Sequence, residues 1–340
     1  MHKFTILLFP LLLCFACKKE IEVVMETPRF PALMEIPEGF PAVQHPEGNE
    51  FTQARWELGK KLFFDPVLSA DNSISCASCH EPSLGFSDNK RVSLGVENRP
   101  GRRNSSPLAN VGYHPYFTRE GAIPTLEMQI LVPIQEHDEF DFNIVLIAER
   151  LAEIEEYIDM SRTAYDREPD AFVITRALSC FERSLISGNS RYDQYFYQEK
   201  TDALNTQELR GLDLFFSDRT GCTNCHTGFN FTDYSLQNNG IYAEYSDEGK
   251  FRLTGEETDR GLFKVPSLRN IELTAPYMHD GSMQTLEEII SHYNSGGKGY
   301  FNQSEKVKAL GLTENEEADL VAFLKSLTDD TFVNNPIFKE

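Results

Sequence analysis

Apolar residues recur at helical spacing in several parts of the chain, most clearly between positions 286 and 293. Leu286, Ile289, Ile290 and Tyr293 fall at positions i, i+3, i+4 and i+7, which is the spacing of a helix with one buried face. Tyr293 is therefore predicted to point toward the core. The neighbouring His292 is turned away from it by about 100°, because a helix has 3.6 residues per turn, and is predicted to lie on the surface.

Two other segments repeat one another. Residues 58–65 read LGKKLFFD and residues 210–217 read RGLDLFFS, and the apolar positions of both have helical spacing. A last amphipathic helix is predicted at residues 313–327, where Thr313 and Glu316 have the spacing of a capping box. These patterns predict an all-α fold that contains two similar helical domains in tandem.

The N-terminal segment has the pattern of an export signal. A basic start precedes an apolar run that is too short to span a membrane stably. Residues 1–17 resemble a lipoprotein signal, with Cys17 as the lipid-bearing residue; an ordinary cleaved signal and an uncleaved anchor have similar patterns. The proline-rich residues 18–48 are predicted to be a tether. Residues 49–195 and 196–336 then form the two predicted domains.

The bulk composition adds little to this picture but excludes one class of partner. A chain of 340 residues is long enough for two ordinary domains. Its formal net charge is −21, and because phosphate binding requires a basic surface, nucleic acid is excluded as a partner. Cys180, in the apolar segment ALSCFERSL, is predicted to be a buried free thiol.

Two copies of the motif C-x-x-C-H carry the most specific chemistry in the sequence. In c-type cytochromes the two thiols bind the vinyl groups of one haem, and the histidine is the proximal iron ligand. A redox cysteine pair would require a βαβ context, and a zinc site would not place histidine identically twice. The sequence predicts two covalent haems, attached outside the cytoplasm, at Cys76, Cys79 and His80 and at Cys222, Cys225 and His226.

Five stretches of the chain are more specific together than any single motif: LGKKLFFDPVLSADNSISCASCH, RRNSSPLANVGYHPYF, Leu126 to Glu139, the second haem motif and GLFKVPSLRNIELTAPYMHDGSMQTLEE. Through them the chain resembles the bacterial di-haem cytochrome c peroxidases and the related MauG-type enzymes over nearly all of residues 50–330. The resemblance implies a periplasmic enzyme that reduces hydrogen peroxide to water at the N-terminal haem. Electrons would arrive through the C-terminal haem from a small donor protein, cytochrome c or a cupredoxin. A MauG-like oxidase of a protein or organic substrate and a plain electron carrier are the alternatives.

The resemblance assigns catalytic residues beside the N-terminal haem. Gln129 and Glu139 match a glutamine and a glutamate that lie near the peroxide-binding face in the family. A carboxylate there can take a proton from peroxide and return it to the leaving oxygen. Family members can close this face with a histidine, but the matching residue here is Val96. We therefore expect the face to stay open without prior reduction.

A second departure from the family concerns the tryptophan that lies between the two haems. Arg119 stands at the matching position, and the single tryptophan of the chain is Trp56. Electron transfer between the haems is then expected to use other groups, and oxidation of the MauG type is less favoured.

The resemblance further implies ligands for calcium and for the haem carboxylates. The Asn104 side chain and the backbone carbonyls of Thr274 and Pro276 match calcium ligands between the domains, and hard oxygen ligands suit Ca²⁺. Arginine suits bidentate contacts with carboxylates, although ordinary ion pairs are the alternative. The candidates for binding haem propionates are Arg103, Arg260 and Arg269.

The position of Tyr293 separates two branches of the family. It is a methionine ligand of the C-terminal haem iron in cytochrome c peroxidases and a tyrosine in MauG-type enzymes. Tyr293 either binds the iron, which would lower the reduction potential, or packs beside the haem as an aromatic side chain. His279 is near this haem in relatives and is otherwise a core histidine. Because family members are commonly dimers, a homodimer is also expected.

Overall fold

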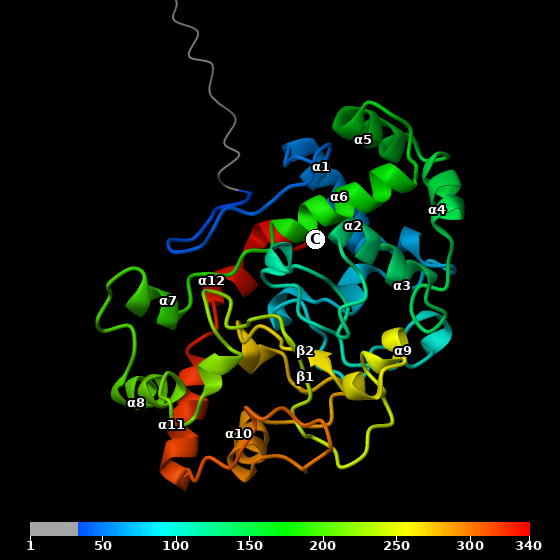
Figure 1. Cartoon of the computed structure of the whole chain (residues 1–340). Coiled ribbons are helices and arrows are strands. Elements are labelled where there is room, and N and C mark those ends of the chain that lie inside the picture. The colour runs from blue at the N-terminus through cyan, green and yellow to red at the C-terminus, as the bar shows by residue number, and fades with distance from the viewer. Residues whose placement is uncertain (1–32) are drawn as a thin grey trace, which may run out of the picture.

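The computed structural model describes residues 33–340, and the predicted signal with Cys17 lies outside the described residues. The described part is helix-rich, with one antiparallel pair of short strands (Figure 1). None of its helices is long and apolar enough to cross a membrane. The elements are α1 (Gln53–Phe64), α2 (Leu126–Gln129), α3 (Leu131–Gln135), α4 (Ile144–Leu151), α5 (Glu155–Tyr165), α6 (Ala171–Arg183), α7 (Arg191–Phe196), α8 (Thr206–Phe215), β1 (Leu236–Gln237), α9 (Phe251–Thr254), β2 (Phe263–Lys264), α10 (Leu286–Ser295), α11 (Glu314–Lys325) and α12 (Asp330–Val333).

Each half of the molecule is built on one pair of crossing helices. In Figure 1, α1 lies along α6 in one half, and α8 lies along α11 in the other. A glycine stands at each crossing, because a Cβ on Gly59 would lie 1.9 Å from the Ala177 carbonyl oxygen, and one on Gly211 would lie 1.9 Å from the Asp319 carbonyl oxygen. Gly59 of the LG segment and Gly211 of the RG segment therefore occupy equivalent positions in the two helix pairs, as the internal repeat predicts.

Replacing Gly211 by alanine is expected to lower the free energy of unfolding by about 1–3 kcal/mol, because the added methyl group forces the two helices apart. Urea unfolding followed by far-UV circular dichroism measures this loss. Gly101→Ala is the control, since its new Cβ would be 3.4 Å from the nearest atom, an ordinary contact. Equal stability of the two variants would show that the close helix crossing is not needed.

The core is divided between the two halves, but the chain end crosses from one to the other. One apolar cluster packs around α1 and α6, and a second around α8, α10 and α11. Phe332 and Phe338 belong to the first cluster, and the ring of Phe332 is 5.5 Å from that of Phe86. Residues 330–338 thus pack with the first half, although the sequence pattern placed residues up to 336 in the second domain.

The local predictions for the last two long helices agree with the structure. Thr313 caps α11, and its capping box with Glu316 is present. Helix α10 spans the predicted apolar face and begins at a second capping box, formed by Thr285 and Glu288. Both helices line the space in front of the second cysteine motif, so these caps also determine where the walls of that site lie.

Candidate haem sites and the space between them

The two C-x-x-C-H motifs form the same local structure. In each, the backbone N–H of the histidine donates to the backbone carbonyl oxygen of the first cysteine over 2.9 Å: His80 to Cys76, and His226 to Cys222. Each motif begins with a short 3-10 helix, at Cys76–Ser78 and at Cys222–Asn224. At the second motif both cysteines and the histidine line one cavity. Burial lowers the pKa of both His80 and His226, which favours the neutral imidazole that binds a metal.

A backbone carbonyl orients each histidine ring. His80 Nδ1 lies 2.9 Å from the Phe86 carbonyl oxygen, and His226 Nδ1 lies 3.0 Å from that of Phe231. Both phenylalanines have left-handed backbone conformations, with φ of 61° and 50°. A bond at Nδ1 leaves Nε2 available for a metal, which is the arrangement that proximal haem histidines require. These residues fit two covalent haems, which supply redox and oxygen chemistry when bound.

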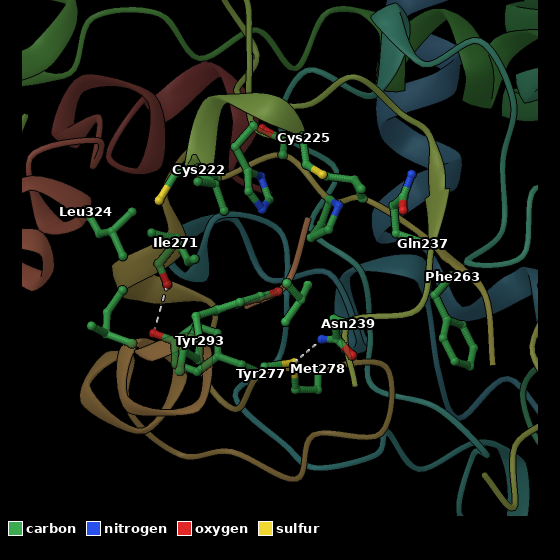
Figure 2. A pocket seen from close by; sticks show the side chains of 18 of the residues that line it. Cys222, Cys225, Gln237, Asn239, Phe263, Ile271, Tyr277, Met278, Tyr293 and Leu324 are labelled. Carbon is green, nitrogen blue, oxygen red and sulfur yellow. Dashed lines mark hydrogen bonds between the residues drawn. The ribbon is translucent and has the colours of Figure 1, made fainter. Parts of the chain in front are cut away.

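A cavity of about 250 Å³ lies in front of the second motif. Figure 2 shows Cys222 and Cys225 on one side of it and Tyr293, Tyr277 and Met278 on the opposite side. Its remaining wall is largely apolar, as a porphyrin face requires, and the wall residues from the core include Leu268, Ile271, Ile289, Ile290, Leu320 and Leu324.

Tyr293 reaches this cavity from α10, on the side opposite the cysteines. Burial raises the pKa of its phenol. The second tyrosine, Tyr277, donates its hydroxyl to the Ile271 carbonyl oxygen over 2.9 Å, and the Met278 sulfur lies 3.4 Å from Asn239 Nδ2. The direction predicted for Tyr293 is therefore observed, whereas its bond to iron stays a prediction.

The surface position predicted for His292 is wrong. Its side chain is buried, and its Nε2 lies 3.0 Å from the Asn239 carbonyl oxygen. The segment around Asn239 covers this side of α10, so the helix is buried over a wider arc than its apolar stripe indicates. His292 is a hydrogen-bonded histidine beside the cavity and not a ligand in it.

Two acids, Glu182 and Glu139, lie within electrostatic range of the first motif. Burial is the main reason that the pKa of both thiols is raised; Glu182 raises the pKa of Cys76 more than Glu139 does, and Glu139 also acts on Cys79. Desolvation raises the pKa of Glu139 itself to about 7, and repulsion from Glu136 and Asp138 adds to the rise. Although the side chain is accessible, protein surrounds the carboxyl closely enough to disfavour its charge.

The backbone around Glu139 is held by the loop that contains Val96. The Val96 N–H donates to the Glu139 carbonyl oxygen over 2.9 Å, and Arg99 Nε donates to the His137 carbonyl oxygen over 2.8 Å.

The side-chain amide of Gln129 has an unsatisfied oxygen, because its Oε1 is buried and has no hydrogen-bond partner among residues 33–340. An orphaned buried amide oxygen is typical of a site that a ligand completes.

Two of the arginines predicted to bind haem propionates are paired with protein carboxylates in or near the interior. Arg269 donates to both oxygens of Asp193 over 2.7 and 2.8 Å, and this ion pair is almost completely buried. Arg103 binds Asp247 over 2.6 and 2.8 Å and also pairs with Glu120. The guanidinium groups of both residues are thus engaged by protein carboxylates, and their contact with haem propionates stays a prediction.

The third candidate, Arg260, is also engaged by protein. It pairs with Glu257 over 2.9 Å and with Glu248 over 2.6 Å. Like Arg103 and Arg269, it is absent from the residues that line the haem cavity. Asp247 and Asp193, the partners of Arg103 and Arg269, are distant in sequence, so the pattern of residues did not reveal them, whereas Glu257 is only three residues from Arg260.

Four other cations line the cavity: Arg119, Lys264, Lys306 and Lys308. Lys306 and Lys308 are exposed, whereas Arg119 and Lys264 are half-buried and form no ion pair with a carboxylate within the described part of the chain. Burial lowers the pKa of Arg119 to about 10 and that of Lys264 to about 8. Since a buried cation without a counterion is costly, these residues are better candidates for haem carboxylates. Sequence reasoning missed Lys264 although it lies in the matched GLFKVPSLRN stretch.

The predicted calcium ligands line the same cavity, but one of them is occupied by protein. Asn104 Oδ1 lies 3.0 Å from Arg119 Nη2, and the Asn104 carbonyl oxygen accepts from Arg119 Nη2 over 2.8 Å. Thr274 and Pro276 are cavity residues. The residues present therefore do not fit calcium as predicted, because a guanidinium already binds the asparagine oxygens.

The remaining singled-out residues are buried. His279 lines the cavity in front of the second motif, and its ring stacks on Phe263 with centroids 4.1 Å apart. Burial lowers its pKa to about 4. Cys180 is fully buried, as predicted, and Trp56 donates its indole N–H to Ser184 Oγ over 2.7 Å.

The repeated helix pair and the two C-x-x-C-H turns define a di-haem c-type protein. A profile described as di-haem cytochrome c peroxidase matches residues 53–201. The chain is 37% identical over 289 residues to the methylamine utilization protein MauG of Methylorubrum extorquens, covering 84% of this chain and 81% of that protein. It is 34% identical over 279 residues to the cytochrome c551 peroxidase of Nitrosomonas europaea, covering 81% and 80%. The chain belongs to the di-haem cytochrome c peroxidase family.

The fold is shared with a solved member of this group. The crystal structure of a MauG-like protein associated with microbial copper homeostasis superposes with a TM-score of 0.85 at 33% identity, covering 89% of this chain and 97% of that one. The diheme peroxidase BthA of Burkholderia thailandensis has the same fold, with a TM-score of 0.71 at 22% identity. The predicted helix-rich fold agrees with these neighbours.

Proposed function

We propose that the protein is a peroxidase that reduces hydrogen peroxide to water at the haem bound by Cys76, Cys79 and His80. The observation that carries this proposal is the arrangement of Val96, Glu139 and Gln129: the Val96 N–H donates to the Glu139 carbonyl oxygen over 2.9 Å, and the buried Gln129 Oε1 has no hydrogen-bond partner among residues 33–340. Desolvation in addition raises the pKa of the Glu139 carboxyl to about 7. An acid with a pKa near neutral pH can act as base and then as acid in one turnover.

The residues of the chain would act as follows. The haem, when bound, supplies the electrons and the site for cleavage of the O–O bond. Glu139 takes the proton from the entering peroxide and delivers it to the oxygen that leaves as water. Gln129 orients the peroxide by hydrogen bonding, and Val96 leaves the face open because a valine side chain has no group that binds iron.

Electrons would enter at the second motif, from a small donor protein such as cytochrome c or a cupredoxin. The second haem is proposed to be held by Cys222, Cys225 and His226, with Arg119 and Lys264 near its carboxylates. The location proposed for the protein is the periplasmic side of a bacterial membrane, with lipid attached at Cys17. A homodimer is proposed from the family resemblance.

A specific observation favours a second function, oxidation of a protein or organic substrate in the manner of MauG. Tyr293 occupies the cavity wall opposite Cys222 and Cys225, and the MauG-like copper-associated protein is structurally similar. Against this function, Arg119 stands where the resemblance expects the tryptophan between the haems. An arginine side chain is not readily oxidised, so it would not relay oxidising equivalents as an indole does.

Steady-state assays with the purified holoprotein, hydrogen peroxide and reduced cytochrome c or reduced cupredoxin separate the functions. A peroxidase oxidises at least one donor in a peroxide-dependent reaction. A MauG-like enzyme consumes peroxide yet oxidises these donors poorly, and a plain carrier shows no peroxide-dependent turnover. Either of the last two results would contradict the proposal.

Tyr293→Phe tests ligation at the second haem. If the phenol oxygen binds iron, its loss is expected to change the ferric absorption and electron paramagnetic resonance spectra of one haem and to raise its reduction potential. Tyr277→Phe is the matched control, because that hydroxyl donates to a backbone carbonyl and its loss should leave both spectra unchanged. Unchanged ferric spectra in Tyr293→Phe would refute ligation.

A further inference from the structure

We propose that the Arg119 guanidinium occupies the cation position between the two halves of the molecule, so that this protein works without calcium there. Arg119 lies between the halves, because its backbone oxygen accepts the N–H of Lys264 on β2 over 2.6 Å. Its side chain reaches back to Asn104, the residue expected to supply the side-chain ligand of calcium. One residue thus joins the strand pair to the asparagine.

Every polar atom of Asn104 takes part in a hydrogen bond. Its backbone N–H donates to the His279 carbonyl oxygen over 3.0 Å, and its Nδ2 donates to the Lys90 carbonyl oxygen over 3.0 Å. Arg119 takes the remaining two acceptors, with Nη2 at 3.0 Å from Oδ1 and at 2.8 Å from the backbone oxygen. Arg119 Nε is 3.2 Å from the same backbone oxygen. The asparagine therefore links both halves with its oxygens turned to a guanidinium.

A calcium ion would compete directly with this arrangement. Calcium ligands lie 2.3–2.6 Å from the ion, so binding at Asn104 Oδ1 would require the guanidinium to leave its present position. The guanidinium has five N–H donors in a fixed plane, which suits several carbonyl oxygens at once. It can therefore hold together the same kind of oxygen atoms that a hard cation would hold.

The surrounding charges add to this competition. Burial is the main reason that the pKa of Arg119 is lowered, and the nearby Arg103 lowers it further, while Lys264 lines the same cavity. Of the carboxylates that act on Arg119, Asp247 and Glu120 are already paired with Arg103, and Asp280 accepts a hydrogen bond from the Tyr242 hydroxyl over 2.6 Å. A divalent ion added beside Arg119 would meet repulsion from both guanidinium groups. Among the described residues, no cluster of three histidine, cysteine or acidic side chains could hold a metal.

The test uses the full-length holoprotein and does not depend on peroxide turnover, so it is separate from the peroxidase proposal. Calcium content is measured by mass spectrometry after desalting, and the thermal midpoint is measured with calcium chloride and with a calcium chelator. For the wild type we expect essentially no bound calcium and the same midpoint in both conditions. For Arg119→Ala we expect a content that approaches one calcium per chain and a midpoint that rises with calcium.

Two further variants keep the test decisive. Arg102→Ala removes an exposed arginine and should behave as the wild type. If Arg119→Ala does not fold with both haems, Arg119→Gln serves in its place, because glutamine retains N–H donors while removing the charge. Stoichiometric calcium in the wild type, or a chelator that lowers its midpoint, would overturn the proposal. A folded Arg119 variant with the wild-type response to calcium would also overturn it.

Discussion

Replacing Glu139 by glutamine is expected to lower kcat/KM for hydrogen peroxide about 10²–10⁴-fold, the usual contribution of a general acid–base residue. Glutamine keeps the size of the side chain and its hydrogen bonds but can neither accept nor return the proton. Both haems should remain attached, since the residue does not bind either cysteine motif. The measurement is peroxide-dependent oxidation of reduced cytochrome c, normalised to the haem content.

Glu136→Gln is the matched control for this prediction. Glu136 lies three residues away in the same loop and only approaches Arg102, at 3.7 Å. We expect its replacement to change kcat/KM little, apart from a small lowering of the pKa of Glu139 by lost repulsion. If Glu139→Gln retains wild-type turnover, or if both variants lose activity equally, Glu139 is not the acid–base residue.

The pH dependence of the wild type follows from the same carboxyl. Its pKa is about 7, and the form that accepts a proton from peroxide is the deprotonated one. Activity should therefore rise with pH through 7, and below that value kcat/KM should fall about tenfold for each pH unit. The residual activity of Glu139→Gln should lack this dependence. A wild-type profile that is flat between pH 5 and pH 8, a range of about three units around the expected pKa, would contradict the assignment.

Replacing Asp193 by asparagine is expected to lower the free energy of unfolding by about 3 kcal/mol, because it leaves the buried Arg269 charge without its partner. The two side chains are 1% and 0% exposed. Arg269 also stacks over the ring of Phe231, at 5.6 Å, and the carbonyl of Phe231 orients His226. The loss should therefore also disturb the spectrum of the second haem. Denaturant unfolding and the ferric absorption spectrum measure the two effects.

An exposed ion pair serves as the control for Asp193. Glu168 pairs with Arg162 on the surface, where the two side chains are 57% and 59% exposed. Glu168→Gln is expected to change the free energy of unfolding by less than about 1 kcal/mol, because solvent screens such pairs. Similar losses of unfolding free energy in the two variants would show that the buried Asp193–Arg269 pair stabilises the protein no more than an exposed ion pair does.

Much of the fold follows from local patterns. The repeated LG and RG segments, the capping box at Thr313 and the apolar face of α10 all appear as predicted. These features depend on residues within one or two helical turns of each other, so the order of residues is enough to specify them. The position of Phe332 could not be predicted from the sequence, because it depends on the path of the C-terminal segment after α11, which packs against the apolar cluster around α1 and α6.

The candidate site divides in the same way. The sequence by itself determined the two haem attachment turns, because both thiols and the histidine lie within five consecutive residues. Only the tertiary structure decided which charged groups are paired with protein and which line the cavity. The fold brings Asp193 to Arg269, and it places the Arg119 guanidinium beside Asn104. The partner of a charge depends on which distant groups share its low-dielectric surroundings, and local spacing does not contain that information.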